Sequence, residues 1–327
     1  MSMDVSVVIP TYRRPNDLSV CLDSLAKQSV PPLEIIVVGY GTDTASEALI
    51  RQREREFEDD GVRLRYVRSN RNSSGASRNM GNRWSQGEIV IFVDDDVILD
   101  ADYVREIVRV YETEPTVLGV QGHDVTDERR DVSNFYLRLF FLYHGEHGGG
   151  RVLPSLNVTY PLTLDKIMPC EWFAGHTSSF RRHVLGEFQY DERIVRRGSR
   201  EDIDLSYRIF KRYPGSLLVT PSARLVHNKS MQGRSSEREL LYMREVYRLY
   251  LFFKLFDTTP GNVLIYLWSR LGFLGMTVVR AVVKRQPDCL VKARNIVGAY
   301  YLCLCHMWEL RRGDLDFFNK GLLQAGN

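Results

Sequence analysis

Short apolar runs alternate with stretches of helical spacing along the first 125 residues of the chain. The strands that this pattern predicts are 5–9, 33–38, 62–67, 88–93 and 117–125. The helices predicted between them are 17–27, 44–57, 75–85 and 102–111. Strands alternating with helices in this way indicate an α/β fold with a doubly wound, mostly parallel sheet. Ligands of such folds bind at the C-terminal ends of the strands.

The pattern changes near residue 235, where long helical stretches begin. We therefore expect an α/β catalytic domain over 1–235 and a helical C-terminal region over 236–327. The helices predicted in that region are 236–256, 262–283 and 291–310. No run reaches about 20 uninterrupted apolar residues, the length needed to cross a bilayer.

The C-terminal region combines Arg and Lys with Tyr, Trp and Leu, a composition suited to a membrane interface. A packed helical bundle or a homodimer interface explains the same composition equally well.

The net charge of +3 is too small to indicate a nucleic-acid partner. The five cysteines form no C-x-x-C pair, and we expect no secretory signal, because residues 1–4 are polar and lead directly into a strand. We expect a cytoplasmic protein, with peripheral contact to the inner face of the membrane left open.

The apolar run 88–93 leads directly into three carboxylates, Asp94, Asp95 and Asp96. At a strand end, residues i and i+2 point to the same side, so Asp94 and Asp96 are expected to converge and Asp95 to point away. Two converging carboxylates suit Mg²⁺ or Mn²⁺. A solvated acidic turn is the alternative interpretation.

Two further segments could carry chemistry. Glu201 and Asp202 open a helical pattern, where acids stabilise the helix dipole but could also supply a general base. His227 follows a short strand, and could be structural or could complete an oxygen-rich metal site.

Two other segments suggest binding. Arg78 lies between Gly75 and Gly81 and could hold a phosphate, although a glycine-capped surface helix has the same pattern. The segment from Trp172 to Arg182 mixes aromatic residues with glycine and hydroxyl side chains, as in a sugar pocket or a packed hairpin.

Taken in order, these segments resemble the family 2 glycosyltransferases, whose fold is called GT-A, over roughly residues 4–230. The segments that carry the resemblance are VSVVIPTYRRP, LEIIVV, GASRNMG, IFVDDD, WFAGHTSSFRR, REDIDLSYR and LVH. Each motif is loose alone, but their order makes chance a poor explanation.

The resemblance implies a role for each matching residue. It implies nucleotide or donor contacts at Pro10, Thr11, Tyr12, Arg78, Asp94, Asp95 and Gly175. It implies that Asp96 and His227 bind the metal and that Asp202 is the catalytic base. Glu201 and Trp172 would contact the acceptor or support the site.

The chain departs from the family after the second strand, where a V-D-D-G-S pattern is usual. Here the sequence is Val38-Gly39-Tyr40-Gly41, and Asp43 comes later. Tyr40 could stack on the base in place of the acid. The nucleotide is therefore open: UDP is the commonest donor of the family, and GDP or dTDP are alternatives.

The function implied is metal-dependent, inverting transfer of a sugar from a nucleotide-diphosphate donor to a hydroxyl of a glycan or polyprenyl-linked acceptor. Mn²⁺ or Mg²⁺ would be the cofactor. A non-catalytic nucleotide-sugar-binding protein and a sugar nucleotidyltransferase are the rival interpretations. The second rival would show a glycine-rich loop after the first strand, where this chain has PTYRRP.

Overall fold

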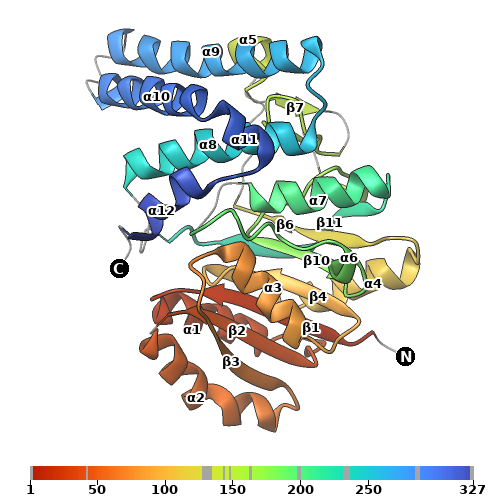
Figure 1. The fold of residues 1–327 in the computed structure, drawn as a ribbon. Coiled ribbons are helices and arrows are strands. Elements are labelled where there is room, and N and C mark those ends of the chain that lie inside the picture. Colours follow the sequence, from red (N-terminus) through yellow and green to blue (C-terminus); the bar gives the residue numbers. More distant parts are fainter. Residues whose placement is uncertain are drawn as a thin grey trace. The chain divides into compact units, whose positions relative to one another are not determined.

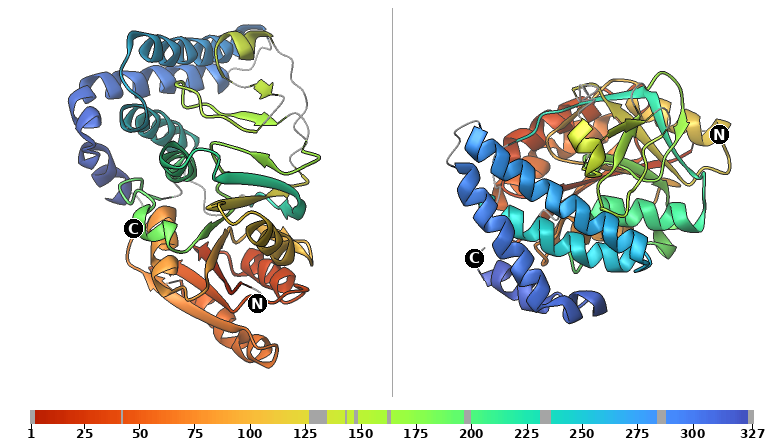
Figure 2. Two further views of the ribbon diagram at one scale, coloured as in Figure 1. Left: turned by 90° about the vertical axis from the view of Figure 1, so that its right-hand side faces the viewer. Right: turned by 90° about the horizontal axis from the view of Figure 1, so that it is seen from above.

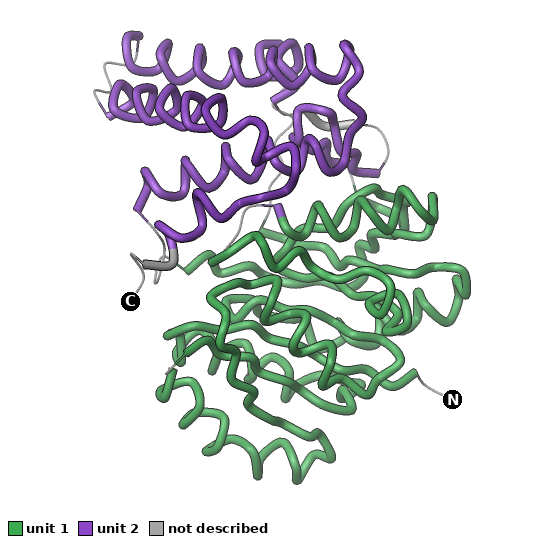
Figure 3. Tube along the Cα trace, viewed as in Figure 1, with its two compact units in different colours: residues 1–128, 163–197, 201–233 green, residues 129–162, 198–200, 234–327 purple. Residues whose placement is uncertain are grey.

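The computed structural model describes most of the chain, which divides into two compact units (Figure 3). The described residues are 3–41, 43–126, 135–142, 144–146, 149–161, 164–196, 200–230, 236–283 and 288–324. Unit 1 consists of residues 1–128, 163–197 and 201–233. Unit 2 consists of residues 129–162, 198–200 and 234–327.

Among the described residues, unit 1 is built on a nine-stranded sheet with the order β3-β2-β1-β4-β10-β6-β11-β5, and β9 pairs with β11 (Figure 1). The strands are β1 (Val5–Thr11), β2 (Glu34–Tyr40), β3 (Arg63–Ser69), β4 (Ile89–Val93), β5 (Val97–Leu99), β6 (Gly119–Asp124), β9 (Met168–Pro169), β10 (Thr177–Arg181) and β11 (Leu217–His227). Strands β1 to β4 are parallel, whereas β10 runs antiparallel to both β4 and β6. The sheet is therefore mixed, with the predicted parallel half intact.

Helices cover both faces of this sheet (Figure 2). They are α1 (Pro15–Leu25), α2 (Thr44–Asp59), α3 (Ser74–Trp84), α4 (Tyr103–Thr113), α6 (Val184–Glu187) and α7 (Glu201–Arg212). Helices α1, α2 and α4 pack with Val7 and Ile9 on one face, and α6 and α7 pack with Val8 on the other. Helix α3 also lies on the second face, where a Cβ at Gly81 would be only 2.2 Å from a methyl of Val8.

Unit 2 is mainly helical. Its elements are α5 (Phe135–Leu139), β7 (His144–Glu146), β8 (Thr159–Pro161), α8 (Glu237–Leu255), α9 (Pro260–Val283), α10 (Asp288–Cys305), α11 (Met307–Arg312) and α12 (Asp316–Gln324). Helix α10 packs against both α8 and α9. Helix α8 begins with a capping box, in which Ser236 and Glu239 each bond the other's backbone amide.

The helix predicted over 291–310 is interrupted, and this prediction is wrong at its C-terminal end. His306 has a non-helical backbone (φ −111°, ψ 30°) and begins the separate helix α11. Its ring stacks on Phe317, with centroids 4.0 Å apart. Helical periodicity alone does not predict this contact, because His306 and Phe317 lie 11 positions apart in the sequence.

A buried ion cluster joins α8 to α9. Glu245 is 1% exposed and lies near three guanidinium groups, those of Arg270 (3.1 Å), Arg244 (3.4 Å) and Arg248 (3.8 Å). Arg244 also lies 4.7 Å from the ring centroid of Phe273. Arg270 thus anchors the middle of α9 to α8.

The outer side of α9 is apolar. Its exposed apolar residues are Leu264, Leu267, Trp268, Leu271, Val278, Val279, Val282 and Val283. Those on α10 and α11 are Leu290, Val291, Val297, Tyr301, Leu304 and Trp308. Within the described part of the chain, α9 alone is long and apolar enough to cross a membrane, judged by length and composition.

Candidate active site

The three acids after β4 separate into two environments. Asp94 and Asp96 converge with His227, and one ligand atom from each lies within 4.8 Å of the others. The i, i+2 spacing predicted the convergence of the two carboxylates. Two carboxylate oxygens and one imidazole nitrogen, reachable by one ion, form a donor set that fits a divalent cation such as Mn²⁺.

Asp95 points away from this group and into the protein. Its carboxylate accepts a hydrogen bond from Thr11 Oγ1 at 2.8 Å, and Arg14 Nη1 lies 3.4 Å from it. Arg14 also approaches Asp96 Oδ2 at 3.2 Å, and both Arg14 and Asp95 are 1% exposed. One buried cation therefore offsets part of the repulsion between the adjacent acids, a contact that the sequence did not reveal.

Asp96 is held in its ionised form. Burial raises the pKa of Asp96, but hydrogen bonds from His227 and the Ser230 backbone amide, with the charge of Arg14, hold it at about 2. Burial lowers the pKa of His227, yet the bond to Asp96 and the charges of nearby acids raise it above 6.5 overall. A divalent cation and the imidazole proton would therefore compete for the same atoms.

Arg78 connects the acidic cluster to α7. Its Nη2 donates to Asp94 Oδ1 at 2.7 Å and to the carbonyl of Gly175 at 2.9 Å, and its Nη1 lies 3.4 Å from Glu201 Oε1. The side chain is 3% exposed and lies over the ring of Tyr190. The glycine-flanked segment thus positions a buried guanidinium between two groups of acids.

Asp202 lies beside Gly175, on the first turn of α7. A Cβ built on Gly175 would be 3.2 Å from Asp202 Oδ2, so the glycine leaves room at this carboxylate. The neighbouring Glu201 is buried, and burial together with the charge of Asp202 raises its pKa above the ordinary value of 4.5. The two acids therefore differ in environment: Glu201 faces Arg78, and Asp202 faces the glycine turn.

The ends of β1 and β2 bring two aromatic rings together. Tyr12 and Tyr40 are half-buried, with centroids 5.3 Å apart and ring planes inclined by 56°. Pro10, within β1, pairs with Val38 of β2. These residues, predicted to contact the nucleotide, thus lie at the ends of adjacent parallel strands.

The departure from the family pattern at Gly39 has a physical reason. A Cβ at Gly39 would be 1.8 Å from the hydroxyl oxygen of Tyr66, so the tyrosine fills the space of the usual acidic side chain. Asp43 is used for structure: it accepts from the amides of Arg13 (2.6 Å) and Ser46 (3.2 Å). Asp43 is 4% exposed, which leaves Tyr40 as the better candidate to meet a base.

Trp172 is 7% exposed, and the neighbouring Phe173 and Phe180 belong to the core. The segment 172–182 is therefore largely packed, and a contact of Trp172 with an acceptor stays a prediction. His176 and Asp124 also lie near His227. Neither residue was expected from the sequence, although His176 lies in the WFAGHTSS segment that resembles a sugar pocket.

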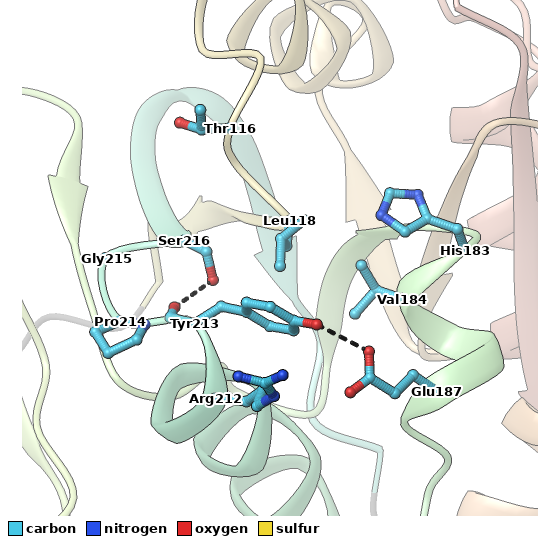
Figure 4. Close-up of a pocket in the computed structure, with 10 residues that line it drawn as sticks. All are labelled: Thr116, Leu118, His183, Val184, Glu187, Arg212, Tyr213, Pro214, Gly215 and Ser216. Atoms are coloured by element: carbon cyan, nitrogen blue, oxygen red, sulfur yellow. Dashed lines mark hydrogen bonds between the residues drawn. The ribbon is translucent and has the colours of Figure 1, made fainter.

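A pocket of about 580 Å³ lies at the opposite end of the sheet from the acids. Figure 4 shows the residues that line it. Its lining includes Leu118 before β6, Val184 after β10 and Ser216 before β11. Tyr213 donates a hydrogen bond to Glu187 there, at 3.0 Å. Neither of the two candidate metal clusters among the described residues contributes to it, so we place the chemistry at the acids.

Comparison with known proteins identifies relatives in sequence and in fold. Residues 6–163 match the family described as Glycosyl transferase family 2. The chain is 27% identical over 235 residues to the glucosyl-dolichyl phosphate glucuronosyltransferase of Haloferax volcanii, covering 69% of each protein. It is 24% identical to the hyaluronan synthase of Pasteurella multocida over 72% of this chain but only 25% of that one.

Solved structures share the fold. The mannosyltransferase PcManGT from Pyrobaculum calidifontis, in complex with GDP-Man and Mn²⁺, has a TM-score of 0.58 at 17% identity, covering 93% of this chain and 88% of that one. S. aureus TarS 1–349 with UDP-GlcNAc has a TM-score of 0.51 at 16% identity, covering 91% of this chain and 79% of that one. We conclude that the chain is a glycosyltransferase, with the sequence of family 2 over residues 6–163 and with the GT-A fold.

Proposed function

We propose that this enzyme is a metal-dependent, inverting glycosyltransferase. It would move a sugar from a nucleotide-diphosphate donor to a hydroxyl of a glycan or lipid-linked acceptor. The observation that carries the proposal is the continuous arrangement from Asp96 and His227, through Asp94 and Arg78, to Asp202. It connects candidate cation ligands with a candidate base inside unit 1.

The acidic cluster serves the donor in this proposal. Asp94, Asp96 and His227 would hold Mn²⁺ or Mg²⁺, which when bound neutralises the charge of the departing diphosphate. The imidazole favours Mn²⁺ over Mg²⁺, which prefers oxygen ligands. Arg78 fixes Asp94 by the 2.7 Å bond and keeps its carboxylate oriented toward the cluster.

Asp202 is the proposed general base. It would accept the proton of the acceptor hydroxyl while that oxygen forms a bond to the anomeric carbon. The bond from the anomeric carbon to the phosphate oxygen breaks in the same step, and the diphosphate leaves with its electron pair. A single displacement inverts the anomeric centre. Gly175 supports this role because its missing side chain gives access to the carboxylate of Asp202.

The Tyr12–Tyr40 pair is the proposed base platform. Half-buried rings at the ends of adjacent strands offer faces for stacking, while Asp43 is occupied by backbone amides. Stacking discriminates weakly between bases. UDP stays our first expectation, and GDP and dTDP are alternatives. Two structures with this fold were solved with GDP-Man and UDP-GlcNAc, which supports the first two nucleotides.

The acceptor we favour is lipid-linked, and unit 2 would rest on a lipid surface. The name of the Haloferax volcanii relative specifies a dolichyl phosphate substrate. The exposed apolar residues of α9 include Trp268, and Arg280 is exposed near the end of the same helix. Helix α10 adds the exposed residues Arg294 and Tyr301. Aromatic and basic residues around an apolar surface favour an interface with anionic lipid. Because Arg270 binds Glu245 of α8, we expect α9 to lie along the surface.

Vesicle flotation tests the lipid contact. Leu267→Glu with Leu271→Glu should abolish binding to anionic phospholipid vesicles while changing the free energy of unfolding by less than about 1 kcal/mol, because both side chains are exposed. Leu240→Glu, at an exposed position of α8, is the matched control and should still float. If the double variant floats normally but loses a dimer seen for the wild type, the surface binds a second copy and not lipid.

Calorimetry tests the donor site. Purified enzyme is titrated with UDP, GDP, CDP and dTDP, each with and without Mn²⁺. We expect one nucleotide to bind tightly with the metal, and Asp96→Ala to weaken this binding at least tenfold. Equal binding by Asp96→Ala would contradict the metal assignment, and binding of no nucleotide would contradict the donor site.

A further inference from the structure

A second cluster of metal-binding side chains lies beside the acidic one. Asp124 is the last residue of β6, His176 precedes β10, and His227 ends β11. One ligand atom from each lies within 4.8 Å of the others, as for Asp94, Asp96 and His227. The rings of His176 and His227 stack, with centroids 4.9 Å apart and planes inclined by 24°. Three strand ends thus bring two imidazoles and one carboxylate together.

The carboxylate of this cluster is oriented by its own neighbours. Asp124 is 5% exposed, and its Oδ1 accepts hydrogen bonds from the amide (2.9 Å) and the hydroxyl (2.6 Å) of Thr126. Hydrogen bonds that fix a ligand are typical of metal sites. The Asp124 carboxylate is thus held in place at the end of β6, where one of its oxygens lies within 4.8 Å of a nitrogen of each imidazole.

The two clusters differ in the ions that they suit. Two carboxylates and one imidazole accept hard ions such as Mn²⁺ or Mg²⁺. Two imidazoles and one carboxylate suit borderline ions such as Zn²⁺ and Co²⁺, and bind Mg²⁺ poorly. Both sets use His227, whose Nε2 is 3.3 Å from Asp96 Oδ1.

We propose that Asp124, His176 and His227 form a second cation site, for a transition-metal ion of the Zn²⁺ class. Because His227 is common to both sets, an ion held there removes a ligand from the acidic cluster. Two divalent ions so close together would also repel each other. Occupancy of the second site therefore opposes Mn²⁺ binding at the first, and only this linkage rests on the proposed function.

Zinc binding to the full chain, without nucleotide, tests the site itself. His176→Gln and Asp124→Asn should each weaken Zn²⁺ binding about 10- to 100-fold in calorimetry. His183→Gln is the matched control, because it removes an exposed imidazole at the opposite end of the sheet and should leave the affinity unchanged. Thermal melts in the absence of metal establish that each variant is folded.

Cobalt gives a second readout that does not depend on the variants. Co²⁺ bound to the wild type should show the visible absorption of a low-coordinate site with imidazole ligands. Zn²⁺ affinity equal in the wild type, His176→Gln and Asp124→Asn would overturn the proposal. So would Zn²⁺ binding that Asp94→Ala weakens as strongly as His176→Gln, since the ion would then use the acidic cluster.

The linkage is tested with Mn²⁺ and the nucleotide that calorimetry selects. Equimolar Zn²⁺ should weaken Mn²⁺-dependent nucleotide binding at least tenfold in the wild type and less than twofold in His176→Gln. An equal effect in both proteins overturns the linkage. Failure of nucleotide binding in all proteins, with His176-dependent Zn²⁺ binding intact, contradicts the donor site and leaves the second cation site standing.

Discussion

Each unit buries an unbalanced cluster of charge, and the two clusters have opposite composition. In unit 1, three adjacent carboxylates meet the guanidinium groups of Arg14 and Arg78. In unit 2, the single carboxylate of Glu245 meets three guanidinium groups. The first cluster has excess negative charge and the second has excess positive charge, and both cost free energy to bury.

The two clusters differ in their exposure to solvent and in the side chains around them. Asp94 keeps 31% of its side chain exposed at the strand ends, so an ion from solution can reach the acids. Glu245 is 1% exposed, and Arg244 and Arg270 lie over the rings of Phe273 and Tyr266. Cation–π contacts with these rings therefore stabilise the excess positive charge of the second cluster. We infer that the first cluster serves chemistry and the second serves the packing of α8 and α9.

The largest effect should come from the proposed base. Asp202→Asn should lower kcat about 10³-fold, equivalent to roughly 4 kcal/mol, because the amide cannot accept the acceptor proton. Nucleotide binding should stay within twofold. Single-turnover transfer and calorimetry measure the two quantities.

Asp204→Asn is the matched control for this variant. Asp204 lies on the same helix but binds Arg208 at 2.8 Å, so its loss should lower the melting temperature and leave kcat near the wild-type value. If Asp202→Asn transfers sugar at the normal rate, unit 1 uses another base.

The second-largest effect should be a loss of stability when the Glu245 cluster of unit 2 is disrupted. Glu245→Gln leaves three guanidinium groups without a counter-charge and should lower the free energy of unfolding by ~3–5 kcal/mol. Urea denaturation measures the loss. Mn²⁺ should not reduce this difference from the wild type, because neither candidate metal cluster among the described residues includes Glu245. Recovery with Mn²⁺ would remove the distinction between the two clusters.

Arg14→Met tests the acidic cluster of unit 1, where we expect Mn²⁺ to compensate for a lost positive charge. Without metal, the buried Asp95 and the neighbouring Asp96 lose their guanidinium, and stability should fall by ~3 kcal/mol. Added Mn²⁺ should restore part of this loss, since a cation at the acids replaces the missing charge. Melting curves with and without Mn²⁺ measure the recovery, and identical curves would count against a cation at the acids.

The smallest effect should be the contribution of Glu201 to the pH dependence of stability. Glu201 has a pKa raised above 4.5, so the folded protein keeps its proton at pH values where the unfolded chain has lost it. Stability from this group is therefore full below pH 4.5 and falls as the pH rises through the raised pKa. Glu201→Gln should flatten this fall in denaturation series above pH 4.5. An unchanged slope would mean that another group titrates.

The sequence predicted the parallel half of the sheet because three of its strands, β1, β2 and β4, are buried on both faces and appear as apolar runs. It also predicted the convergence of Asp94 and Asp96, which depends only on local strand geometry. It could not predict that Tyr66 fills the space beside Gly39, since that contact requires the register of β2 and β3. Asp124 and His176 lie 52 positions apart and meet only through strand pairing. Long-range contacts therefore account for what was missed.

The bond between Asp43 and Arg13 has a consequence for how a donor arrives. Arg13 has a left-handed backbone (φ 54°), which costs of order 1 kcal/mol in a non-glycine residue. Asp43 caps α2 and holds the Arg13 amide at 2.6 Å, so one carboxylate links the loops that follow β1 and β2, beside Tyr12 and Tyr40. The entropy of ordering these loops is then lost during folding and not during binding. A nucleotide would meet a preorganised site, and differences between nucleotides should appear mainly in their residence times.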